Sequence, residues 1–162
     1  MTGGDTVADN DYKSEYSTLA TIFNTGWSTE SPVHYENLPF TPVVGTAWAR
    51  FTVLGGGADF ASIGSPKNNM IRHSGVIQIQ CFVPLGSGVA KSREMADKAL
   101  AIFMNSEQAD YHFQAGYAVT VPAGDTDAWY QVNAVIPYWR DSYEYQIPIP
   151  PVDEDEPTEP EE

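Results

Sequence analysis

The stretch that decides the fold is residues 75–84, Gly-Val-Ile-Gln-Ile-Gln-Cys-Phe-Val-Pro. Apolar and polar side chains alternate along it, a period of two that is typical of a β-strand with one covered face. The apolar set is Ile77, Ile79, Cys81 and Val83. Pro84 has no N–H to donate to a neighbouring strand, so pairing is expected to end there.

Residues 89–105 follow a short glycine loop and change to a helical period. Four apolar residues fall at i, i+3, i+4 and i+7, which predicts one buried stripe: Ala96, Ala99, Leu100 and Phe103. Three charged residues, Glu94, Asp97 and Lys98, lie off that stripe. A strand followed by a helix on its buried face forms a core, and the other elements are expected to pair with it or cover it.

The same stretch has the outline of a phosphate-binding loop, because Lys91 opens the helix after glycines. That motif requires a Gly directly before the Lys and another five residues earlier. Ala90 and Leu85 occupy those positions, so the glycines are interpreted as a loose connection.

Before this stretch, the spacing of aromatic residues predicts a first helix over residues 11–27. Asp9, Asn10 or Asp11 is expected to cap its beginning, and Gly26 is expected to mark its end. Residues 33–40 predict a short strand, and 47–54 a longer one. The segment 55–74 shows no clear period and is expected to be a connection, part of which could pair as a hairpin arm. Extended segments are expected at 111–113, 117–121 and 129–138, with 139–146 extending the last strand.

This order of elements predicts an α+β domain, a mostly antiparallel β-sheet flanked by two α-helices. The domain is expected to span residues 11–146, between a flexible N-terminus at 1–10 and a disordered Pro-rich acidic tail at 147–162. In the strand at 47–54, Arg50 is bracketed by large apolar residues, which favours contact with another subunit. The candidate subunit interface is therefore Trp48, Arg50, Thr52 and Leu54.

The chain is acidic, with a formal net charge of −14 over 162 residues, and its last ten residues contribute seven acids. It offers no basic patch with which to grip a DNA backbone. No apolar run has the length of a membrane span, and the N-terminus lacks a signal-peptide pattern, so no membrane partner is expected.

Catalysis is not expected either. His34, His73 and His112 are far apart and show no metal-ligand spacing. The single cysteine, Cys81, has no adjacent cation and sits on the apolar face of its strand, which indicates a buried thiol. We therefore expect neither an active site nor a cofactor.

Several phrases, in order, resemble a known family. They are Val33-His34-Tyr35-Glu36-Asn37-Leu38-Pro39-Phe40-Thr41-Pro42, Trp48-Ala49-Arg50-Phe51, Ile63-Gly64, Arg72 to Gln80, Phe82-Val83-Pro84, Gly86, Gly88, Ala96-Asp97 and Trp129-Tyr130-Gln131-Val132-Asn133. The combination is similar to the tail-terminator, or tail-completion, proteins of phages with long non-contractile tails, and covers roughly residues 15–140. The acidic tail is not part of that pattern.

The resemblance implies a structural virion protein, assembled in the host cytoplasm, that forms a homo-oligomeric ring, a hexamer. Such a ring caps the tail tube protein, ends tube polymerisation and joins the tail to the head-completion or neck protein, while DNA passes through its lumen without sequence-specific binding. The candidate tube or neck contacts lie in the 55–74 segment: Lys67, Asn68, Asn69, Arg72 and His73. Two alternatives remain, another neck or tail protein (head-completion or tube protein) and a small-ligand-binding α+β domain with an apolar pocket.

Overall fold

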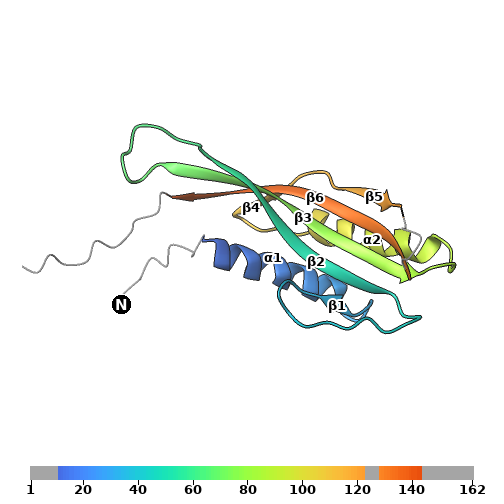
Figure 1. Cartoon of the computed structure of the whole chain (residues 1–162). Helices are drawn as coiled ribbons and strands as arrows, with labels where there is room; N and C mark the ends of the chain where they lie inside the picture. The colour runs from blue at the N-terminus through green and yellow to red at the C-terminus, as the bar shows by residue number, and fades with distance from the viewer. Residues whose placement is uncertain (1–10, 123–127, 144–162) are drawn as a thin grey trace, which may run out of the picture.

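A computed structural model describes residues 11–122 and 128–143 of the chain. Six strands form one open sheet in the order β1-β2-β3-β6-β4, with β5 also paired to β6 (Figure 1). The elements are α1 (Tyr12–Trp27), β1 (Val33–His34), β2 (Trp48–Phe60), β3 (Met70–Pro84), α2 (Ala90–Met104), β4 (Tyr111–Phe113), β5 (Tyr117–Val121) and β6 (Trp129–Tyr143). All pairings are antiparallel except that of β1 with β2. The predicted α+β fold class is confirmed.

The central strand, β3, contains the stretch from which the sequence analysis began. Its four apolar residues from Ile77 to Val83 are all buried, as the alternation predicted. β3 begins five residues earlier than predicted, at Met70, and pairs along its whole length with β6. It lies between β2 and β6 and holds the sheet together.

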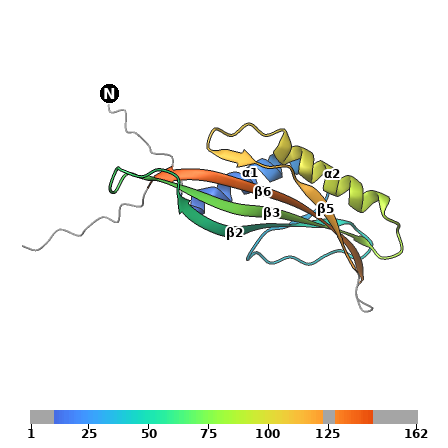
Figure 2. The same ribbon diagram turned by 90° about the horizontal axis from the view of Figure 1, so that it is seen from above.

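Both helices cover the same face of the sheet (Figure 2). The buried face of α2 contains Ala96, Ala99 and Phe103 of the predicted stripe, together with Met95 and Ser92, and Leu100 is partly buried at its edge. In α1, Phe23 stacks on Phe51 of β2 at 5.2 Å between ring centroids and is parallel to Phe103 of α2 at 6.4 Å. These aromatic contacts join the two helices and the sheet into one core.

The first helix begins as predicted but ends for another reason. Asp11 is the N-cap, and its carboxylate accepts the Ser14 N–H at 2.8 Å. The helix continues through Gly26 and ends at Trp27, where Ser28 has φ 49° and donates its N–H to the Asn24 carbonyl. Gly26 therefore does not terminate the helix: a Cβ there would lie 2.7 Å from the side chain of Ile102, so the glycine lets α1 approach α2.

The expectation that residues 55–74 form a connection is corrected by the structure. β2 continues to Phe60 and β3 starts at Met70, so a β-hairpin, with a bulge between Gly55 and Gly57, replaces most of that connection. We call residues 55–74 the arm. The three glycines, Gly55 to Gly57, have no side chains that could alternate between apolar and polar, so the sequence does not reveal this strand. Main-chain pairing of β2 with β3, and of β3 with β6, stabilises it instead. The arm projects past the helices at one end of the sheet (Figure 1).

The remaining strands differ in length from those predicted. The strand expected at 33–40 is reduced to the two residues of β1, after which Asn37 adopts φ 54° and the chain turns away before Pro39. β4 and β5 coincide with the predicted segments, and β6 extends through Tyr143. The proposed terminal segments, 1–10 and 147–162, lie outside the described residues.

Gly75 of β3 lies opposite Tyr138 of β6, and substituting this glycine should have a measurable effect on packing. A Cβ at this position would lie 2.7–2.9 Å from the ring and hydroxyl of buried Tyr138. We expect Gly75→Ala to lower the free energy of unfolding by about 1–3 kcal/mol, because the buried Tyr138 ring, whose hydroxyl is bonded to Glu15, would have to shift. The matched control is Gly55→Ala, whose Cβ would meet nothing within 4 Å. Urea denaturation of both variants checks this, and equal stabilities would contradict it.

Candidate assembly surfaces

One face of the sheet carries no helix, and the candidate interface residues lie on it. We call it the open face. It presents the even-numbered side chains of β2 and β3, with Thr52 opposite Gln78, Arg50 opposite Gln80 and Leu54 beyond them. The odd-numbered residues of β2, such as Phe51, point to the core. The four predicted residues therefore do share a face, as the period of two required.

Arg50 is fixed at the centre of this open face. Its Nε donates to His34 Nδ1 at 3.2 Å, and a terminal nitrogen donates to Gln80 Oε1 at 3.5 Å. The guanidinium also lies within 6 Å of the rings of Trp48 and Phe82. An ordered arginine flanked by aromatic rings is a common anchor in protein interfaces.

Trp48 lies on the open face but is covered by the chain itself. Its ring stacks on Phe82 at 4.0 Å, with Phe40 at 5.0 Å and Trp129 edge-on at 6.0 Å. Only 6% of the residue is exposed. Replacing Trp48 would therefore remove core packing of the monomer, and Arg50 and Leu54 are the better probes of an interface.

The open face also includes exposed apolar groups. Leu54 is 47% exposed, and Tyr117 and Val119 of β5, which lie on the same face beyond β6, are 54% and 43% exposed. Apolar side chains around an arginine and two glutamines give the mixed composition of a subunit interface.

The arm carries the other predicted contact residues in two different settings. Lys67, Asn68 and Asn69 lie in its tip, where Lys67 has φ 68° and the Asn69 side chain accepts the Ser65 N–H at 3.1 Å. Ile63, also in the tip, is 95% exposed. A tip with exposed polar and apolar groups is available to a partner.

Arg72 and His73 lie not in a loop, as the sequence analysis expected, but in β3. Arg72 forms two hydrogen bonds of 2.9 Å with the carboxylate of Asp141, and these bonds lower the pKa of that carboxyl group. Its guanidinium lies 3.7 Å from the centroid of the Trp139 ring, which stacks on His112 at 3.7 Å. Arg72 thus belongs to an ordered surface stack on the paired strands of the arm, opposite Asp59.

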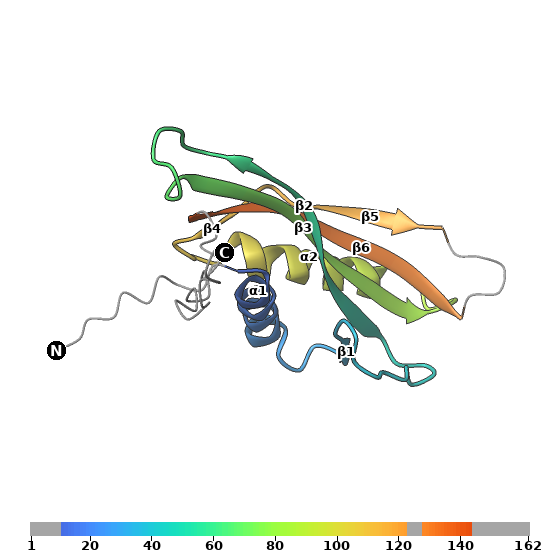
Figure 3. The ribbon, with the colours of Figure 1, turned by 60° about the vertical axis from the view of Figure 1, so that its left-hand side comes forward.

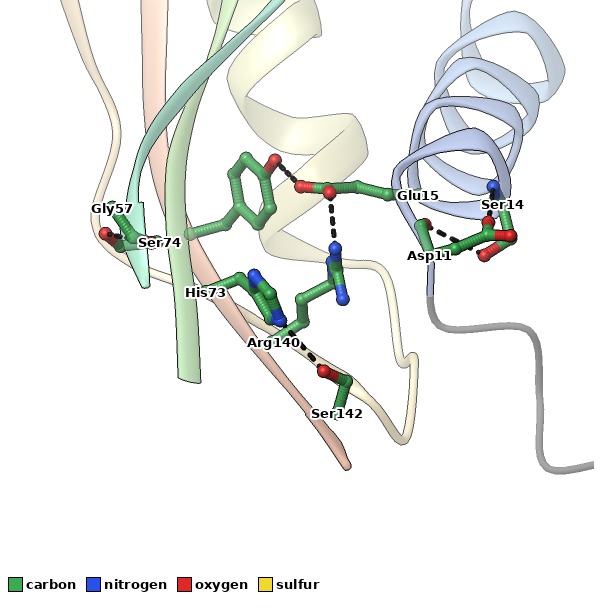
Figure 4. Close-up of polar contacts among 9 residues, drawn as sticks. Asp11, Ser14, Glu15, Gly57, His73, Ser74, Arg140 and Ser142 are labelled. Carbon is green, nitrogen blue, oxygen red and sulfur yellow. Dashed lines mark hydrogen bonds and ion pairs between the residues drawn. The ribbon is translucent and has the colours of Figure 1, made fainter. Parts of the chain in front are cut away.

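His73 points to the opposite side of β3 and is buried. Its Nε2 is 2.8 Å from the hydroxyl of Ser142, and burial, followed by the charge of Arg140, lowers its pKa (Figure 4). This histidine is a core residue and is not placed to touch a tube or neck protein.

A buried polar cluster that the sequence analysis missed ties α1 to the base of the arm. Glu15 of α1 accepts hydrogen bonds from Tyr138 and, at 2.7 Å, from Arg140, both on β6 (Figure 4). Burial and the hydrogen bond to Glu15 raise the pKa of Tyr138. The signal was present in the sequence, because Glu15 lies four residues before Leu19 on the buried side of α1 and Arg140 continues the alternation of Ile136 and Tyr138.

The three histidines do not come together in the structure. His34 contacts Arg50, His73 contacts Ser142 and His112 stacks on Trp139. In the described ranges, no three His, Cys, Asp or Glu residues form a group that could hold a metal ion. Across the same ranges, none of the helices has the length and apolar character to cross a bilayer.

Cys81 is fully buried, as predicted, and burial raises the pKa of its thiol to about 12. Because only the thiolate attacks disulfide reagents, we expect no reaction of the folded protein with Ellman's reagent at pH 8. One thiol per chain should react after unfolding in guanidinium chloride. Rapid labelling of the folded protein would contradict the buried placement.

Comparisons with known proteins agree with the resemblance seen in the sequence. The model of a family described as phage tail terminator protein matches residues 14–138, most of the chain. A solved structure has the same fold, with a TM-score of 0.53 and 18% identity, over 82% of this chain and 97% of that one. At that identity the likeness shows the fold alone. A comparison with curated proteins gives no match.

Proposed function

Since the chain belongs to the phage tail terminator protein family, we propose that it forms a ring that caps the tail tube and ends its polymerisation. The family gives the chain a structural role in the phage tail. Ring closure, termination of the tube and attachment of the tail to the head-neck complex are the parts that we propose. No catalytic step is needed for any of them.

The open face is the observation that supports a ring most strongly. A closed ring requires a heterologous contact, in which one surface meets a different surface on the next copy. In the described chain, the helices occupy one face of the sheet only, and on the other face Leu54 is exposed and Arg50 is partly exposed. We propose that Arg50, Thr52 and Leu54 meet the neighbouring subunit, with the Trp48 ring holding Arg50 in place on the same face.

The arm is the proposed contact with the tube or the neck. It extends past the body of the domain, and its tip presents Lys67, Asn68 and Asn69 beside exposed Ile63. We propose that Arg72 supports this contact from the paired strands of the arm through Asp141 and Trp139, while His73 packs in the interior of the domain.

The acidic charge suits a channel for DNA. With 22 acids and eight bases, the chain lacks the excess of basic residues that a DNA-gripping surface needs. A net-negative lumen would let DNA slide through without adhering to the wall. We propose a hexamer located at the head-tail junction of a long, non-contractile tail and assembled in the host cytoplasm.

A ligand-binding domain is the competing proposal of a different class. It expects the aromatic residues of the sheet to line a pocket, whereas Trp48, Phe82, Phe40 and Trp129 pack against one another. A groove of about 520 Å³ lies elsewhere, between α1 and the segment after β1, and is widely open to solvent. A pocket that holds a small molecule is normally more enclosed.

The mass of the purified protein across a concentration series tests the ring directly. We expect a monomer in equilibrium with one closed oligomer, seen as six-fold rings in negative stain, alone or on added tail tubes. Open-ended filaments would favour a tube subunit instead. A monomer or dimer that ignores tubes and carries a small molecule would favour the ligand-binding domain.

A further inference from the structure

β5 is an exposed edge of the sheet that lacks the usual protection. It pairs with β6 on one side, and on its other side no strand pairs with it within residues 11–122 and 128–143 (Figure 3). Its sequence, Tyr-Ala-Val-Thr-Val, contains neither a charged residue nor a proline. Edge strands are normally blunted by charges, prolines or bulges, because a bare edge is a template for another strand. The β5 edge is therefore suited to be covered in an assembly.

The sequence after β6 has the pattern of a strand that bonds from one side only. Residues two apart in an extended chain point their N–H groups to the same side. In Tyr145-Gln146-Ile147-Pro148-Ile149-Pro150, both prolines fall on one side, and three N–H groups remain on the other. The three residues that keep these N–H groups, Tyr145, Ile147 and Ile149, also place their side chains on one face of an extended chain, and all three are apolar. Such a segment can complete a sheet edge without extending it further.

This segment cannot reach β5 of its own copy. β6 ends at Tyr143, opposite Met70 and next to the tip of the arm, whereas β5 begins at Tyr117, opposite Val135 (Figure 1). The eight residues of β6 between those levels span roughly 27 Å. Ile149 lies six residues past Tyr143, about 20 Å of fully extended chain. An edge covered by this segment would therefore belong to another molecule.

We propose that the segment 145–150 of one subunit adds as a strand to the exposed edge of β5 in the neighbouring subunit. Each copy then provides one inserted strand, residues 145–150, and one β5 edge that receives a strand. In a closed head-to-tail ring, every such segment and every β5 edge is paired. This inference rests on the proposed ring and gives it a second contact besides the open face. Main-chain hydrogen bonds supply the contact, as in other strand-addition interfaces.

Two proline variants of the full-length protein test the exchange. Ile147→Pro removes an N–H from the side of the segment that would bond to β5. Gln146→Pro removes an N–H from the opposite side, where Pro148 and Pro150 already have none. Hydrogen exchange of the β5 amides in the assembled ring should be slower than in the dilute monomer by roughly tenfold or more. We expect Gln146→Pro to keep this protection and Ile147→Pro to lose it, with dissociation of the ring at higher protein concentration.

The outcomes separate this inference from the proposed function. Rings with equal β5 exchange in both variants would overturn the strand exchange and leave the ring standing. Protection of β5 that survives Ile147→Pro in an intact ring would show that another part of the neighbour covers the edge, and so also overturn it. A chain that forms no ring, with or without tail tubes, would contradict both. A chain shortened to end at Val152, which lacks only the acidic run, should behave as the full-length protein does.

Discussion

Replacing Arg140 by methionine is expected to lower the free energy of unfolding by about 3–5 kcal/mol. Arg140 is completely buried, and its guanidinium is 2.7 Å from the carboxylate of Glu15, which is itself 5% exposed. Without the arginine, Glu15 keeps its charge in a buried site, where the hydrogen bond from the Tyr138 hydroxyl cannot replace the lost cation. An uncompensated buried charge is among the largest destabilising changes that one substitution can cause.

A double-mutant cycle separates the ion pair from the packing. Glu15→Gln combined with Arg140→Met removes both charges, so the double variant should be more stable than the sum of the two single effects predicts. Arg72→Met is the matched control, because its pair with Asp141 is half exposed and such pairs contribute little. Guanidinium denaturation gives all the stabilities. Equal losses for Arg72→Met and Arg140→Met would contradict the role of the buried cluster.

Leu54→Asp is expected to weaken ring assembly by roughly a hundredfold per contact while the monomer stays folded. Leu54 is 47% exposed in the monomer, so an aspartate there remains hydrated until two subunits meet. Burying that carboxylate without a partner at the proposed interface costs about 3 kcal/mol, which corresponds to two orders of magnitude in affinity. Arg50→Glu should act in the same direction by reversing the charge at the centre of the open face.

The control for this prediction is Val44→Asp. Val44 is also an exposed apolar residue, at 91%, but it lies in the loop before β2 and not on the open face. Sedimentation velocity over a concentration series measures assembly, and circular dichroism shows that each variant is folded. Loss of assembly in Val44→Asp alone, with Leu54→Asp unaffected, would move the interface to the loop side of the domain.

Much of the fold was predictable because local patterns and tertiary packing agree in β3, α2 and β6. The alternation of Ile77 and Ile79 with glutamines settled both the strand and its buried face. The arm was not predictable, since Gly55, Gly56 and Gly57 carry no side chains whose alternation could reveal a strand. Its order comes from main-chain pairing with β3, a non-local effect.

The candidate surfaces were predictable in part for the same reason. A period of two correctly placed Arg50, Thr52 and Leu54 on one face of the sheet. The sequence did not show that Phe40 and Trp129, distant along the chain, cover Trp48. The sequence also placed Arg72 and His73 in a loop, because residues 55–74 do not alternate between apolar and polar side chains. In the structure both residues belong to β3, which directs them to opposite faces of the sheet.

The most direct test of termination is to add the protein to tail tube subunits of the same phage while they polymerise. Electron microscopy then measures tube lengths and the density at each tube end. Our account predicts that elongation stops as the protein is added and that one end of every arrested tube carries a six-fold ring. Tubes that continue to grow at the same rate, with bare ends at saturating protein, would contradict it.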